Sequence, residues 1–166
     1  MTRTNRLEKM ILRLTAQRNC LDLAADMIAG LPGPVLEFGL GKGRTYDYLR
    51  NRLADREIFV FERDIHCPPD CIPADGHLLL GDVHDTVPDA LARIGEPAAL
   101  AHFDIGTHDR AADAPFIDWL ALAVTPLVRV GGIVVSDRSM TNPRWAELSL
   151  PPDTSDGYHF VYRVER

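Results

Sequence analysis

The sequence lacks the features that would direct it to a membrane or to secretion. No stretch approaches about 18 uninterrupted apolar residues, so a membrane-spanning helix is not expected. The N-terminal stretch MTRTNRLEKMILRLTAQRN alternates charged and apolar side chains and has no continuous apolar core, which argues against a signal peptide. Three cysteines, an odd number, do not indicate a disulfide framework. We therefore expect a cytoplasmic protein without a membrane partner.

Lysine and net positive charge are also scarce. Only two of the 18 basic side chains are lysines, Lys9 and Lys42, and 24 acidic residues leave a formal net charge of −6. Proteins that bind nucleic acids usually present a basic surface to the phosphates. The charge balance therefore argues against a nucleic-acid partner.

The length of 166 residues is sufficient for one domain with its own core. Near the N-terminus, four apolar residues recur at helical spacing and predict an amphipathic helix: Leu7, Met10, Ile11 and Leu14. Asn19 is a candidate N-cap for a second helix over residues 20–30, which the Pro-Gly-Pro turn at 32–34 would end. We expect a single domain, 1–166, with N-terminal helices in 1–30 and an α/β core in 35–166.

Within the core, short apolar segments alternate with helix-like segments. Strands are expected over 35–38, 58–61, 77–80, 99–103, 133–135 and 158–164, and helices over 44–54, 86–94, within 111–129 and briefly after Pro143. This alternation predicts an α/β fold with a doubly wound, mostly parallel sheet and helices on both faces. The first four strands are short and apolar, as strands buried on both faces should be.

A glycine-rich turn follows the first expected strand, in the stretch VLEFGLGKGRTYDYL over residues 35–49. In a doubly wound sheet, ligands bind outside the carboxyl ends of the strands, near such a turn. A phosphate-binding loop needs GxxxxGK followed by Ser or Thr, but Gly43 follows Lys42 and residue 36 is leucine. A dinucleotide turn needs its third glycine at position 44, which is arginine.

A third pattern matches the same turn. The stretch EFGLGKG, from Glu37 to Gly43, resembles the ExGxGxG first motif of class I S-adenosylmethionine-dependent methyltransferases. In that family the turn lies against the methionine part of the cofactor. An acid at the strand end suits its ammonium, and the N-terminus of the next helix suits its carboxylate. The resemblance covers residues 20–137. It implies a Rossmann-like methyltransferase fold with an antiparallel last strand, S-adenosyl-L-methionine as cofactor and S-adenosyl-L-homocysteine as product.

Other motifs of the family occur in the expected order. Glu62 resembles the acid that binds both ribose hydroxyls, because a carboxylate can accept from both groups of a vicinal diol. Asp82 resembles the aspartate that binds the adenine amino group, and Asp104 ends the fourth strand near the transferred methyl. The resemblance thus implies twelve cofactor-binding residues: Glu37, Phe38, Gly39, Gly41, Gly43, Thr45, Glu62, Arg63, Gly81, Asp82, Val83 and Asp104.

Polar residues after the fourth and fifth strands are candidates for the chemistry. Methyl transfer needs an in-line approach, and a general base helps when the acceptor is a hydroxyl or a protonated amine. The candidate catalytic residues are Asp104, His108 and Asp137. Their layout resembles DGxH…GGxxxxDD of methyltransferases related to metal-dependent O-methyltransferases, so a divalent ion is one alternative. Because Arg138 follows Asp137, we expect no metal. A loop histidine with acids bonded only to backbone is the remaining alternative.

Several patterns bear on the methyl acceptor. Amino methyltransferases of nucleic acids carry [DNS]PP[YFW] after the fourth strand, where this sequence has DIGT at 104–107. The partial match NPRW at 142–145 follows the fifth strand and is expected to be a turn into a short helix. Cys67 and Cys71 beside His66 could ligate zinc, but no second ligand pair follows, so an irregular loop near the adenosine is expected. These features favour a small-molecule acceptor.

Size bears on assembly and on the alternatives. The 29 residues after Asp137 are too few for a substrate cap, so the acceptor pocket needs the N-terminal helices, strand-end loops or another subunit. We therefore expect a homo-oligomer. Two other functions remain open: a SAM- or nucleotide-binding module without catalysis, and a small NAD-dependent oxidoreductase. Against the oxidoreductase, the sequence has no Tyr-x-x-x-Lys pair, since Lys9 and Lys42 are the only lysines.

Overall fold

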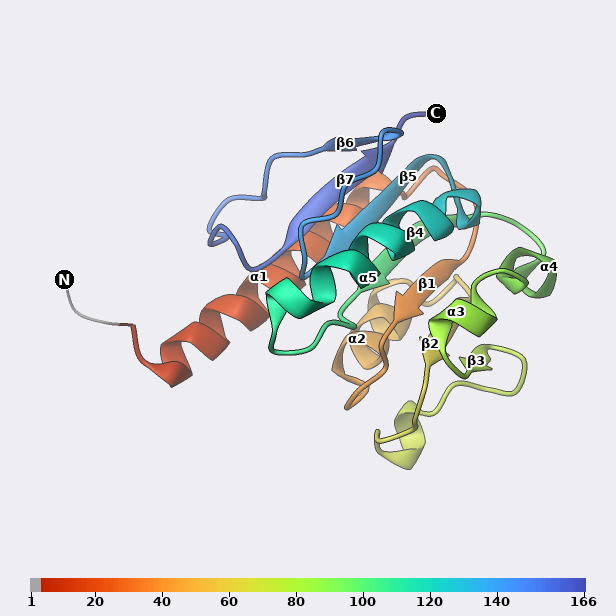
Figure 1. Cartoon of the computed structure of the whole chain (residues 1–166), viewed down its shortest axis with the longest axis horizontal. Helices are drawn as coiled ribbons and strands as arrows, with labels where there is room; N and C mark the ends of the chain where they lie inside the picture. Colours follow the sequence, from red (N-terminus) through yellow and green to blue (C-terminus); the bar gives the residue numbers. More distant parts are fainter. Residues whose placement is uncertain (1–3) are drawn as a thin grey trace.

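A computed structural model of the chain, which describes residues 4–166, contains one seven-stranded sheet with helices on both faces (Figure 1). The strand order is β3-β2-β1-β4-β5-β7-β6. Strands β1 to β5 are parallel, and β7 runs antiparallel to both of its neighbours. The predicted doubly wound α/β fold with an antiparallel last strand is confirmed. The first three residues of the expected N-terminal helices lie outside the described residues.

The strands are β1 (Val35–Phe38), β2 (Ile58–Glu62), β3 (Leu78–Leu80), β4 (Ala98–Phe103), β5 (Val128–Ser136), β6 (Trp145–Glu147) and β7 (Phe160–Val164). The α-helices are α1 (Arg6–Met27), α2 (Arg44–Arg52), α3 (Val83–Thr86), α4 (Ala90–Ile94) and α5 (Arg110–Ala123). Two short 3₁₀ helices are η1 (Pro69–Cys71) and η2 (Thr125–Leu127).

The order of the strands places a crevice beside β1. After β1 the chain continues to β2 and β3 on one side, whereas β4 and β5 lie on the other side. Every residue of β1 and β4 is buried, which agrees with sequences that are apolar except for Glu37 and His102. Because the loops after β1 and β4 leave the sheet in different directions, the carboxyl ends of these strands form the usual ligand position of a doubly wound sheet.

Two apolar layers cover the faces of the sheet. Helices α1 and α2 pack on one face, where Leu21, Ala24 and Leu49 meet β1, β2, β4 and β5. Helices α3, α4 and α5 cover the other face. On this second face Phe38 stacks between two phenylalanines of neighbouring strands, with ring centroids 4.2 Å from Phe61 and 4.4 Å from Phe103.

The N-terminal region differs from the prediction of two helices. One continuous helix, α1, runs from Arg6 to Met27, and its capping box is formed by Asn5 and Glu8 rather than by Asn19. No glycine or proline interrupts the helix, so nothing in the sequence stops it near residue 19. The second half packs on the sheet, and the first half projects beyond it (Figure 1). In the part of the chain that the structure describes, no helix has the length and apolarity needed to cross a bilayer.

Four other expectations need correction. The helix expected over 86–94 is two short helices, because Pro88 lies between α3 and α4 and removes a backbone donor. The segment after Pro143 forms strand β6 instead of a helix. The glycine pair at 131–132, expected before the fifth strand, lies inside β5 at an irregularity in the pairing with β4. At the sheet edge, β3 is only partly buried, with Leu80 55% exposed.

Candidate functional site

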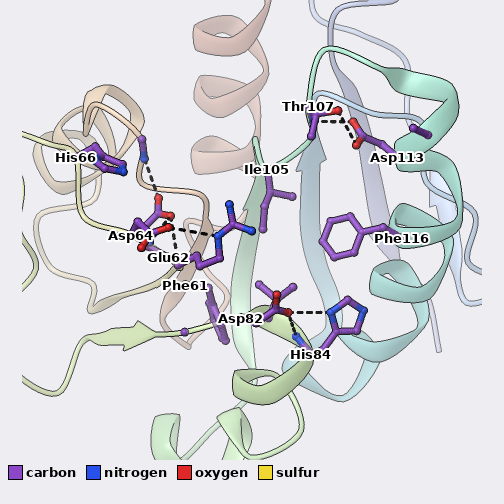
Figure 2. Close-up of a pocket in the computed structure, with 15 residues that line it drawn as sticks. Phe61, Glu62, Asp64, His66, Asp82, His84, Ile105, Thr107, Asp113 and Phe116 are labelled. Carbon is purple, nitrogen blue, oxygen red and sulfur yellow. Dashed lines mark hydrogen bonds and ion pairs between the residues drawn. The ribbon is translucent and has the colours of Figure 1, made fainter.

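A cavity of about 480 Å³ lies at the carboxyl ends of β2, β3 and β4 (Figure 2). Its volume falls in the range of small-molecule sites. In Figure 2, Glu62 and Asp64 lie on one side of it, Thr107 and Asp113 on another, and the Phe116 ring faces it from α5. Six of the predicted cofactor-binding residues line it: Gly41, Glu62, Arg63, Gly81, Asp82 and Val83.

Glu62 ends β2 and organises one wall of the cavity. Its Oε2 accepts the backbone N–H groups of Leu40 (2.8 Å) and Gly41 (3.0 Å) in the glycine turn. Its Oε1 accepts the N–H groups of Arg63 (2.7 Å) and Asp64 (3.2 Å). A carboxylate has about four lone-pair sites, and these four backbone donors use them, so ribose hydroxyls would bind Glu62 by taking the place of some of these bonds.

Asp82 lies opposite, at the start of α3. Its Oδ1 accepts the backbone N–H of His84 at 2.9 Å and pairs with Nδ1 of the same imidazole at 2.8 Å. These two bonds to His84 lower the pKa of Asp82 below its ordinary value, so the carboxylate is ionised at neutral pH. Within residues 4–166, both hydrogen bonds of the Asp82 side chain are on Oδ1, which leaves Oδ2 as an acceptor for a donor in the cavity.

The glycine turn between β1 and α2 is shaped by close contacts. Gly39 and Gly43 have positive φ angles of 93° and 77°. A Cβ atom at Gly39 would lie 2.5 Å from the carbonyl oxygen of Asp104, and one at Gly43 would lie 2.5 Å from Cβ of Cys71. A Cβ at Gly41 would meet no atom within 4 Å, and Gly41 lines the cavity. The turn is therefore tightly packed at Gly39 and Gly43 and open to the cavity at Gly41.

Glu37, the acid before the first glycine, is fully buried and turned away from the cavity. Its Oε2 lies 2.7 Å from Nδ1 of His102 on the adjacent strand, and its Oε1 accepts the hydroxyl of Thr45 in α2. Burial alone would lower the pKa of His102, but the Glu37 carboxylate outweighs it and raises the pKa. Glu37 and Thr45 thus tie β1, β4 and α2 together beneath the turn.

Asp104 follows β4 and belongs to the same polar chain. Its two carboxylate oxygens each accept from Nη2 of Arg13 at 2.8 Å, and Oδ2 also accepts from Gln17 at 3.1 Å. The Gln17 amide nitrogen lies 3.3 Å from Nε2 of His102. Burial would raise the pKa of Asp104, but the Arg13 guanidinium, His102 and the Gln17 bond together lower it. Asp104 is therefore an ionised group held against α1.

Asp137 and His108 occupy different environments. Asp137 follows β5 and is 4% exposed, with Oδ2 paired to Nη1 of Arg138 and Oδ1 buried without a hydrogen-bond partner among residues 4–166. Burial and the nearby Asp104 charge raise the pKa of Asp137. His108 lies exposed in the loop after β4. The structure thus brings Asp104 and Asp137 into one electrostatic cluster and leaves His108 at the surface.

Arg138 fastens the loop after β4. Its Nη2 donates to the carbonyl of Thr107 and lies 3.4 Å from Oδ2 of Asp113. Asp113 in turn accepts the backbone N–H of Thr107 at 2.6 Å and its hydroxyl at 2.9 Å. Burial would raise the pKa of Asp113, but these Thr107 bonds and Arg138 lower it. The guanidinium adjacent to Asp137 disfavours a cation there, and within the described chain no group of three His, Cys, Asp or Glu side chains is arranged to hold a metal ion.

Several residues at the site were not predicted from the sequence. Arg13 and Gln17 are 91 and 87 positions away from Asp104 along the chain, and only the packing of α1 brings them there. His102 lies inside an apolar strand. His84 follows the Gly-Asp-Val motif by one residue, and this adjacency to Asp82 was the one signal that could have identified it. Phe116 carried only the helical periodicity of a core residue.

Comparison with known families and structures gives a consistent result. The family model of the S-adenosyl-L-methionine methyltransferases matches residues 4–164. A solved structure of an S-adenosyl-L-methionine methyl transferase from Silicibacter pomeroyi DSS-3 is 41% identical, with a TM-score of 0.91, and the match covers 98% of this chain and 99% of that one. No curated protein matches the sequence.

Two more distant structures share the fold. Human Methyltransferase-like protein 13, solved in complex with SAH, is 14% identical with a TM-score of 0.54, over 95% of this chain and 80% of its own. Cofactor-bound Rv0187 from MTB is 17% identical with a TM-score of 0.55, and the match covers 99% of this chain and 83% of that one. The family match over nearly all of the described residues decides between the functions left open by the sequence, and its cofactor is S-adenosyl-L-methionine. The chain belongs to the S-adenosyl-L-methionine methyltransferase family.

Proposed function

We propose that this methyltransferase, as a single domain over residues 1–166, transfers the methyl group of S-adenosyl-L-methionine to a small-molecule acceptor. The observation that carries the proposal is that Glu62 and Asp82, the two predicted adenosine-binding acids, line one cavity. When bound, the cofactor supplies an electrophilic methyl on a sulfonium. The chain binds and orients both reactants and accepts a proton where the acceptor has one to lose.

The adenosine fits the cavity on chemical grounds. The ribose hydroxyls bind the Glu62 carboxylate in place of some of its backbone donors, and Oδ2 of Asp82 offers an acceptor for the adenine amino group. The open side of Gly41 admits the ligand close to the backbone. The methionine part then lies along the turn, towards the backbone of Asp104 that packs on Gly39. In this arrangement Glu37 and Thr45 stabilise the turn by linking β1 to α2, on the side away from the cavity.

The acceptor side lies at the ends of β4 and β5. The environments of Asp104 and Asp137 move their pKa values in opposite directions, which is typical of carboxyl groups with different roles. Ionised Asp104 provides negative charge near the sulfonium. Asp137, with its raised pKa and unpaired Oδ1, is the better candidate to accept a proton from the acceptor. His108, exposed in the adjoining loop, is placed to contact an entering acceptor.

The acceptor is proposed to be small because the chain carries a net negative charge and because α1 is tied to the acceptor side. A net charge of −6 opposes binding of a polyanion. The Arg13–Asp104 ion pair ties α1 across the acceptor side, so a large substrate would have to displace the helix.

We further propose a homo-oligomer in the cytoplasm. The apolar stripe on the first half of α1 supports the assembly, since Leu7 is 70% exposed, Ile11 54% and Met10 47%. Such a patch on a projecting helix is typical of an interaction surface. Sedimentation velocity should show an oligomer that Ile11→Glu dissociates, with the exposed Glu165→Ala as control. A monomer that binds S-adenosyl-L-homocysteine normally would contradict this. Cell fractionation tests the compartment.

Turnover with methyl-tritiated S-adenosyl-L-methionine and a metabolite extract tests the function. We expect label in a small product, a large loss of turnover in Asp137→Asn with S-adenosyl-L-homocysteine affinity preserved, and no change in the exposed control Asp156→Asn. Label in protein or nucleic acid instead would contradict the small-molecule acceptor. Binding of the cofactor without transfer to any fraction would contradict the proposed activity.

A further inference from the structure

His84 stands out among the residues around the cavity because it does two things at once. It lines the cavity, and it bonds Asp82 through both its backbone N–H and its imidazole (Figure 2). It also stacks on Trp119 of α5, with ring centroids 4.0 Å apart and planes 25° apart, and lies 5.7 Å from the ring of Phe116. Neither the family motif nor the sequence pattern assigns it a role.

We propose that His84 is a positioning residue that sets the specificity of the cofactor site for an adenine base. The inference rests on the proposed placement of the adenosine beside Asp82. Its imidazole holds the Asp82 carboxylate in one orientation, and its ring, supported by Trp119 and Phe116, forms the aromatic wall beside the base.

The hydrogen-bond geometry explains how His84 acts through Asp82. An ionised carboxylate only accepts, so Nδ1 of His84 carries the proton in this contact. Two donors on Oδ1 restrict rotation of the carboxylate. The other oxygen, Oδ2, is then directed as a fixed acceptor. Because both side chains are about half exposed, at 47% for Asp82 and 55% for His84, the carboxylate would otherwise rotate in solvent.

The fixed acceptor distinguishes adenine from hypoxanthine. Adenine presents an amino donor at position 6, whereas hypoxanthine presents a carbonyl acceptor there and a donor at the neighbouring ring nitrogen. The first helical residue, Val83, supplies a backbone N–H of the kind left without a partner inside a helix. With adenine, the amino group donates to Oδ2 of Asp82 and the ring nitrogen accepts from the Val83 N–H. With hypoxanthine, an acceptor faces Asp82 and a donor faces the Val83 N–H, so both contacts are mismatched. A site that leaves polar groups unpaired in this way rejects the wrong base strongly.

The aromatic contacts contribute differently. The Trp119 and Phe116 rings are themselves close, at 6.1 Å between centroids, so they and His84 form one cluster at the edge of the cavity. Stacking against a purine is tolerant of the base because every purine has a π-face. The ring of His84 should therefore affect affinity for both nucleosides equally, and its Nδ1–H should affect the discrimination between them.

Calorimetric titration with S-adenosyl-L-homocysteine and S-inosyl-L-homocysteine tests this separation. His84→Phe keeps a ring on Trp119 but loses the donor. In this variant we expect the ratio of the two affinities to fall by about tenfold, and the part of the affinity that comes from stacking to change little. In His84→Asn, which keeps a donor but loses the ring, both affinities should fall together and the ratio should persist. Asp82→Asn should abolish the preference for adenine, and His77→Phe, outside the cavity, should change nothing.

The outcomes separate the inference from the function on which it rests. A ratio unchanged in His84→Phe overturns the positioning role, even if the wild-type protein binds S-adenosyl-L-homocysteine well. An equal loss of discrimination between the two ligands in His84→Asn and His84→Phe would also contradict the separate roles of the donor and the ring. A wild-type protein that binds neither ligand, or binds both equally, would instead refute the placement of the adenosine beside Asp82.

Discussion

Removal of the imidazole of His159 should make the protein markedly less sensitive to acid. His159 precedes β7 and is completely buried, and neither ring nitrogen has a hydrogen-bond partner among residues 4–166. Burial lowers its pKa to about 3, and the neighbouring His102 and Arg13 add to this effect while Asp104 opposes it. The unfolded chain, in contrast, protonates this histidine at its ordinary pKa of about 6.5.

The sign and magnitude follow from this difference. Between the two pKa values the unfolded state binds one more proton than the folded state, so the stability contributed by neutral His159 is present above about pH 6.5 and is lost as the pH falls towards 3. Each pH unit in this window costs about 1.4 kcal/mol, so lowering the pH from 7 to 5 should remove about 2 kcal/mol through this residue alone.

Urea unfolding at pH 7 and pH 5 measures the effect. His159→Phe and His159→Asn both abolish the titration, so each should lose about 2 kcal/mol less than the wild type between the two pH values, whatever its stability at pH 7. The exposed His108→Gln should behave like the wild type. Equal acid sensitivity of the wild type and both His159 variants would refute the assignment of a buried neutral imidazole.

Three further predictions concern the glycine turn and the polar cluster behind it. Gly43→Ala should lower the free energy of unfolding by about 1–3 kcal/mol in urea titrations, because its φ is positive and the new methyl would meet Cβ of Cys71. Arg13→Ala should raise the pKa of Asp104, measured by carboxyl-carbon NMR, since it removes the nearest cation; an unchanged value would contradict the ion pair. Arg138→Met should destabilise the fold by about 3–5 kcal/mol in thermal or urea unfolding, because it leaves two buried carboxylates without their cation, and Arg138→Lys should recover part of that loss.

The fold could largely be predicted because its signals are local. Buried parallel strands such as β1 and β4 are apolar except for one residue each, Glu37 and His102, and a glycine-rich turn separates β1 from α2. The errors arose where local signals were weak or misleading. Asn19 suggested a cap, but nothing ended the preceding helix, and the capping pair was Asn5 with Glu8. Pro88 was a visible breaker that should have divided the helix expected there.

The site could be predicted only where residues follow a strand end directly. Glu62 and Asp82 do so, and the parallel sheet brings their loops to the same edge. The partners that surround Asp104 come from α1, far away in sequence, so no spacing rule reveals them. The inward orientation of Glu37 is a consequence of His102 on the neighbouring strand, and strand register is not readable from one sequence.

The central claim is that the adenosine of the cofactor binds in the cavity at Glu62. Calorimetric titration of S-adenosyl-L-homocysteine into the wild type, Glu62→Ala and the exposed control Glu165→Ala tests it most directly. We predict one site per chain in the wild type and the control, and a loss of affinity of about a hundredfold or more in Glu62→Ala, because the ribose acceptor and the anchor of the glycine turn are removed together. Equal affinity in Glu62→Ala and the wild type would contradict the account.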